Sequence, residues 1–76
     1  MIVIYDMEKT YFRKDARDAQ PILKELYGEK LGKEAYENMV NAPVGSTYRK
    51  HGGPLVKVVT EAEGKQIREK EAAISL

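Results

Sequence analysis

The 76-residue sequence predicts an α+β domain with a small, mostly antiparallel sheet. Three observations support this fold class: an apolar run at residues 2–5, two consecutive segments with helical periodicity, and a glycine-rich turn between two strand-like runs within residues 46–59. A polar helical segment follows. The expected order is strand, an optional second strand, two helices, a hairpin and a final helix, in one domain covering residues 1–76.

The run Ile2–Tyr5 consists of β-branched and aromatic residues. Because it is apolar at every position, it is typical of a strand covered on both faces, and we expect it at the centre of the sheet. Residues 10–12 are strand-like too. They either pair back through a turn at residues 6–9 or form a loop whose aromatic rings pack on the sheet, and both possibilities stay open.

The first predicted helix has apolar residues at three- and four-residue steps. Pro21 locates its start, because a proline is tolerated in the first turn, where its missing N–H has no partner anyway. Asp18 is then the predicted N-cap and Gly28 the C-terminal stop. A start at Asp15 would place the proline inside the helix, at a cost of about 3 kcal/mol. The expected buried face consists of Ala19, Ile22, Leu23, Leu26 and Tyr27.

A second helix is predicted over residues 33–41. It ends before Pro43, since the residue preceding a proline is pushed out of the helical conformation. Its expected buried side consists of Leu31, Ala35, Tyr36, Met39 and Val40.

The clearest local feature is a hairpin with strands at residues 46–50 and 55–59. Pro54 cannot donate the N–H that would close a two-residue Gly-Gly loop, so we expect a four-residue loop at 51–54.

This loop length places Lys50 opposite Leu55. In that register Val56 and Val58 face the core, and Tyr48 lies on the other face of the hairpin.

The final helix is predicted from residue 61 to about residue 73. Thr60 and Glu63 form a capping box at its start, and Gly64 weakens it by about 1 kcal/mol. A helix with so thin an apolar stripe either lies lightly on the sheet or uses the stripe on a partner. The stripe consists of Ala62, Ile67, Ala72, Ala73 and Ile74.

Composition restricts the class of protein. There is no cysteine, which excludes disulfides and thiolate metal sites and favours a reducing, cytoplasmic location. No run approaches the roughly 18 apolar residues of a membrane span, and the N-terminus lacks the basic region of a signal peptide, so no membrane partner is expected. With 13 basic and 12 acidic residues, the net charge of +1 disfavours a dedicated nucleic-acid binder.

Residues suited to catalysis are sparse. His51 is the only residue poised to titrate near neutrality, but it lies in a turn beside basic residues, with no neighbouring acid to orient it. The spacing of Asp15 and Asp18 suits a carboxylate pair, yet capping explains it. One histidine and no cysteine disfavour a transition metal, and the glycines match no phosphate-binding loop. We therefore expect no catalytic site, no cofactor and no metal.

The candidate binding residues lie where basic and aromatic side chains are adjacent. Residues 44–60 contain no acid, whereas acids and bases alternate elsewhere. Aromatic rings beside cations suit stacking on bases with contacts to phosphate, and they suit the core of a protein interface equally well. Ordinary packing at a sheet edge explains them too. The residues are Tyr48, Arg49, Lys50, His51, Lys57, Tyr11 and Arg13.

These observations favour a small non-catalytic binding or regulatory protein that acts through protein–protein contact, with a homodimer as one form. So small a domain has little stability of its own, and oligomerisation would support it. The alternative is weak nucleic-acid binding by the hairpin at residues 46–59. An enzyme is the third possibility and would require His51 to meet Asp15 or Asp18 in space.

Overall fold

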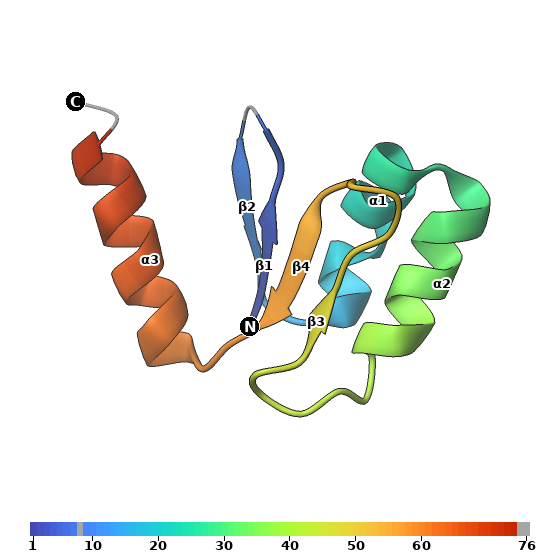
Figure 1. Cartoon of the computed structure of the whole chain (residues 1–76). Helices are drawn as coiled ribbons and strands as arrows, with labels where there is room; N and C mark the ends of the chain where they lie inside the picture. The colour runs from blue at the N-terminus through green and yellow to red at the C-terminus, as the bar shows by residue number, and fades with distance from the viewer. Residues whose placement is uncertain (8, 75–76) are drawn as a thin grey trace.

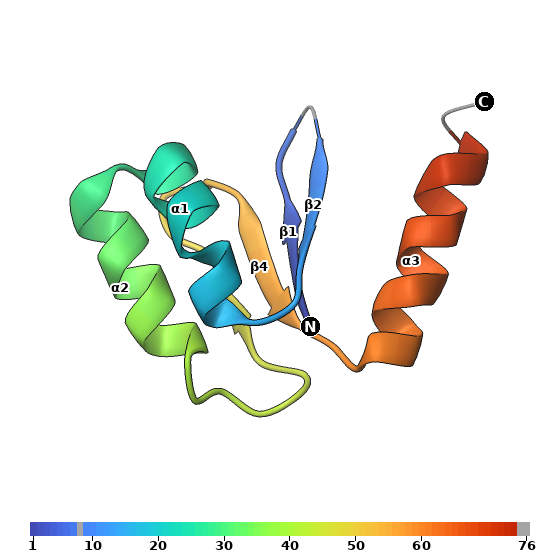
Figure 2. The ribbon, with the colours of Figure 1, turned by 180° about the vertical axis from the view of Figure 1, so that it is seen from behind.

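The computed structural model describes residues 1–7 and 9–74 and confirms the predicted α+β fold. Four antiparallel strands form one sheet in the order β2-β1-β4-β3. Helices α1 and α2 cover one face, and α3 lies on the opposite side (Figures 1 and 2). The elements are β1 (Ile2–Tyr5), β2 (Thr10–Arg13), α1 (Ala16–Tyr27), α2 (Glu29–Met39), β3 (Thr47–Tyr48), β4 (Leu55–Val58) and α3 (Glu61–Ile74).

The main core lies between the sheet and the α1–α2 layer. β1 is a central strand, as its apolar sequence predicts, and Ile4 is completely buried among the core residues. Successive strand residues point to opposite faces, so Val3 faces away from this core and yet is also completely buried. The sheet is therefore covered at its centre on both faces.

The residues at 10–12 belong to a strand rather than a loop. β2 pairs with β1 in register, with Tyr5 opposite Thr10 and Ile2 opposite Arg13. The turn between the strands is closed by a bond from the Asp6 N–H to the Lys9 carbonyl, 3.0 Å long. β2 forms one edge of the sheet, and β3 forms the other.

The predicted start of the first helix is wrong. α1 begins at Ala16 with Asp15 as its N-cap, and Pro21 lies inside the helix. The cap is reciprocal: Asp15 Oδ1 accepts from the Asp18 N–H at 2.8 Å, and Asp18 Oδ2 accepts from the Lys14 N–H at 3.1 Å. This cap and the burial of Ala16 in the core offset the cost of the proline. The predicted stop at Gly28 is confirmed.

The second helix starts four residues earlier than predicted, at Glu29. A glycine normally disfavours a helix interior, but Gly32 is buried against α1, where only a residue without a side chain fits. α2 ends at Met39, and Val40 is the C-cap residue with 37% of its surface exposed. Its predicted burial is wrong because the chain leaves the helix at that residue.

The predicted hairpin register is wrong by one residue. Tyr48 pairs with Val56 rather than with Lys57, so its ring enters the core. The turn is tighter than the predicted four-residue loop: His51 and Gly52 both adopt positive φ, 54° and 68°, and the Gly53 N–H donates to the Lys50 carbonyl at 2.9 Å. This is the pattern of a type I′ turn, which closes on Gly53 and so needs no N–H from Pro54. Between this closing pair and the pair of Tyr48 with Val56, the second strand has one residue more than the first, and this extra residue sets the observed register.

The bounds of the last helix agree with the prediction, and so does the Thr60 half of the predicted capping box. α3 begins after Thr60, whose Oγ1 accepts from the Glu63 N–H at 3.1 Å. It packs chiefly against β2. Within the described residues, no helix is long and apolar enough to cross a membrane.

Candidate functional site

The basic residues of the hairpin do not form one surface. Lys50 pairs with Glu34 of α2, and the Arg49 Nε donates to the Gly53 carbonyl at 2.9 Å. The hydrogen bond and charge of Lys50 lower the pKa of Glu34, and the same contact raises the pKa of Lys50. Lys57 pairs with Val3 in the sheet and shares its face, on the side away from the main core.

Tyr48 is not available as a surface ring. It is 8% exposed and packs edge to face against Tyr27, with ring centroids 5.6 Å apart. The Tyr27 hydroxyl donates to the Pro54 carbonyl, which ties α1 to the hairpin. Burial raises the pKa of both tyrosines. The sequence predicts Tyr48 as an exposed binding residue because the predicted hairpin register turns its ring away from the core.

The remaining predicted residues lie at the other edge of the sheet. Tyr11 is on β2, with the Lys9 ammonium 5.0 Å and the Arg13 guanidinium 5.8 Å from its ring centroid. An Arg13 side-chain nitrogen also donates to the Phe12 carbonyl at 2.8 Å. The predicted site residues are thus divided between β2 at one edge and the β3–β4 hairpin at the other.

The structure does not bring His51 together with Asp15 or Asp18. His51 is exposed in the turn that follows β3, at the end of the sheet where Tyr5 pairs with Leu55. Asp15 and Asp18 lie at the opposite end, after Arg13, and act as helix-capping groups. Among residues 1–7 and 9–74, no three potential metal ligands cluster.

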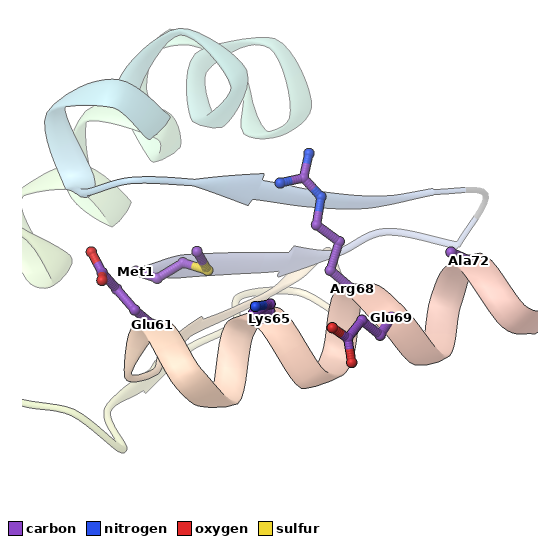
Figure 3. A pocket seen from close by; sticks show the side chains of 6 residues that line it. All are labelled: Met1, Glu61, Lys65, Arg68, Glu69 and Ala72. Atoms are coloured by element: carbon purple, nitrogen blue, oxygen red, sulfur yellow. The ribbon is translucent and has the colours of Figure 1, made fainter.

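A groove lies between α3 and the N-terminal residue. It has a volume of about 550 Å³. Met1 and Glu61 lie at one end and Ala72 at the other, and the Arg68 side chain extends from α3 towards β2 (Figure 3). We call it the α3 groove. It is lined mainly by apolar surface, contributed by Met1, Glu61, Lys65, Arg68, Glu69 and Ala72.

Contacts with Met1 and β2 hold α3 beside this groove. Gly64 is buried against the Met1 side chain, and the Arg68 guanidinium lies 5.6 Å from the Phe12 ring centroid. The Thr10 hydroxyl donates to Glu71 Oε1 at 3.1 Å. Burial raises the pKa of Tyr5 on the same side of the sheet, and the charges of Glu71 and Glu63 raise it further.

The polar rim of the α3 groove carries charges of both signs. Glu61, Lys65 and Glu69 are exposed, and none of them forms an ion pair with another described residue. Within the described part of the predicted apolar stripe, Ala62 and Ala72 are exposed and Ile67 is half-buried. The side chains at positions 73 and 74 lie outside the described residues.

Sequence reasoning identified the thin stripe of α3 but missed the groove. The groove depends on the contact between residues 1 and 64, which are far apart in the chain. The only local signal was the glycine within an otherwise helical segment, since such a glycine often marks a close approach.

No family model, curated protein or solved structure matches this chain. Its function is therefore inferred from the surfaces of the molecule itself.

Proposed function

We propose that this chain is a small non-catalytic binding protein that acts through protein–protein contact at the α3 groove. The observation that carries the proposal is the groove itself: a concave, mostly apolar surface with a charged rim, on a helix that packs thinly on its own sheet. An apolar centre surrounded by polar groups is the usual anatomy of a protein interface. The lack of cysteine supports a reducing, cytoplasmic setting for it.

A protein suits this surface better than a nucleic acid. The rim contains Glu61 and Glu69 beside Lys65 and Arg68, and carboxylates repel phosphate. The alternative site at the hairpin has also lost support, because Lys50 is ion-paired and the other predicted residues are dispersed.

The test is a selection of displayed peptides on the wild-type protein. Selected peptides are expected to lose binding when Ala72→Arg fills the end of the groove. Gln66→Arg is the matched control, because position 66 is exposed on the same helix and does not line the groove. Circular dichroism checks that both variants fold. Equal binding to wild type and Ala72→Arg would contradict the proposal.

Nucleic-acid binding is tested separately with labelled single- and double-stranded oligonucleotides at low and near-physiological salt. The proposed function predicts no saturable binding. Binding that falls with salt and is lost in Arg49→Ala/Lys50→Ala would instead establish the hairpin as a nucleic-acid site.

A further inference from the structure

We infer that a small pocket between two tight turns of the sheet binds a small zwitterion, a molecule with an ammonium and a carboxylate on one carbon, as in a free α-amino acid. We call it the turn pocket. This inference goes beyond the proposed function, and the turn pocket shares no lining residue with the α3 groove. It uses Arg49, a predicted binding residue for which the α3 groove has no role.

The turn pocket lies at the end of the sheet where the turn after β1 and the turn before β4 are both found (Figure 1). Asp6 and Met7 line it from the first turn, and Arg49 and Gly52 line it from the hairpin. It has a volume of about 130 Å³, room for roughly four water molecules at about 30 Å³ each. A molecule the size of glycine or alanine therefore fits, whereas a nucleotide is too large.

One base and one acid line the turn pocket without pairing with each other. The Arg49 Nε donates to the Gly53 carbonyl at 2.9 Å, and the other N–H groups of its guanidinium have no partner among the described residues. The Asp6 backbone N–H donates to the Lys9 carbonyl at 3.0 Å, and the Asp6 carboxylate forms no ion pair within the described part of the chain. Both charged groups are therefore available to a ligand, on backbone that a tight turn holds in place.

The two charges together select the class of ligand. The terminal nitrogens of a guanidinium bind a carboxylate through two parallel hydrogen bonds, and a carboxylate accepts hydrogen bonds from an ammonium. A simple anion would bind Arg49 but meet repulsion from Asp6, and a simple cation would meet the reverse. A zwitterion satisfies both groups at once. The side chains of Met7 and Pro54 line the same pocket and offer apolar surface to the carbon between the two charges.

The inference is tested by adding glycine or L-alanine to the wild-type protein while two-dimensional amide NMR spectra are recorded at constant pH and ionic strength. We expect saturable shifts at residues 5–7, 49, 52 and 53, with half-saturation on the order of millimolar, because ion pairs in an open pocket are weak. Acetate offers only the carboxylate and methylammonium only the ammonium. Each should bind about tenfold more weakly than glycine, because it lacks one charge-assisted hydrogen bond.

Two variants assign each charge of the ligand to one side chain. Arg49→Gln should weaken glycine binding about tenfold without weakening methylammonium binding, and Asp6→Asn should weaken glycine binding without weakening acetate binding. Arg17→Gln and Glu37→Gln are the matched controls, because both positions are exposed and neither lines the turn pocket. Circular dichroism checks that the variants fold.

Three results would overturn the inference: no saturable shift with glycine or alanine, acetate binding as tightly as glycine, or glycine binding unchanged in both pocket variants. The comparison of ligands on the wild-type protein needs no variant, so it decides the matter even if a variant fails to fold.

Discussion

The backbone of Gly32 in α2 lies directly against that of Lys24 in α1: a Cβ atom at position 32 would come 2.6 Å from the Lys24 Cα. Gly64 in α3 is buried as well, but its added Cβ would meet the Met1 sulfur, at the flexible end of a side chain. The fold therefore requires glycine strictly at position 32 and less strictly at position 64.

Gly32→Ala should destabilise the protein by about 1–3 kcal/mol, because two backbones must separate to admit the methyl group. Gly64→Ala should be close to neutral, because Met1 can move and alanine favours a helix interior over glycine by about 1 kcal/mol. Urea unfolding of both variants measures the difference. A larger loss for Gly64→Ala than for Gly32→Ala would show that the helix packing is wrong.

Pro21→Ala should stabilise the protein by about 1–2 kcal/mol. Alanine restores the N–H that bonds the carbonyl of residue 17, a gain of about 3 kcal/mol that is partly offset by the greater entropy of the unfolded chain. Pro43→Ala is the control, because Pro43 lies in a loop and its removal should not stabilise. If α1 instead began after Asp18, Pro21 would lie in the first turn and the substitution would bring no gain.

The two stacked tyrosines should respond differently to loss of the hydroxyl. Tyr27→Phe should cost about 1 kcal/mol, because it removes the bond to the Pro54 carbonyl. Tyr48→Phe should be neutral or slightly stabilising, because its buried hydroxyl has no hydrogen-bond partner of normal geometry among the described residues. Thermal unfolding compares them. A greater loss for Tyr48→Phe would place a bonded partner, such as the nearby Glu34 carboxylate, at that hydroxyl.

The pairing of Glu34 with Lys50 should make a small, pH-dependent contribution to stability. The pKa of Glu34 is lowered from its ordinary 4.5. The ion pair therefore stabilises the fold above pH 4.5, and this stabilisation disappears as the pH falls through the lowered pKa of Glu34. Glu34→Gln should therefore be less stable than wild type at neutral pH and equal to it in acid, with a smaller difference at high salt. Glu37→Gln, an exposed change on the same helix, is the control.

Local signals in the sequence predicted the parts of the fold that depend on neighbouring residues. The uninterrupted apolar run at β1, the glycine stop of α1 and the Thr60 cap of α3 each involve residues a few positions apart. The errors occur where a distant contact outweighs a local preference. Gly32 reads as a helix breaker, yet the close approach of Lys24 explains why it lies inside α2.

The same contrast between local sequence signals and distant contacts applies to the candidate site. The hairpin closes on a tight turn at His51 and Gly52, and an extra residue on its second strand sets the pairing that turns Tyr48 from surface to core. The α3 groove requires Met1 to lie beside Gly64, and no pattern within either segment indicates that contact.

The most direct test of the α3 groove as a protein-binding site is a series of two-dimensional amide NMR spectra recorded on the wild-type protein while a peptide selected on it is added. We expect shifts confined to the groove side of α3, at residues 61, 65, 68, 69 and 72. Shifts confined to the hairpin at residues 46–59, or no shifts at all, would contradict protein binding at the α3 groove.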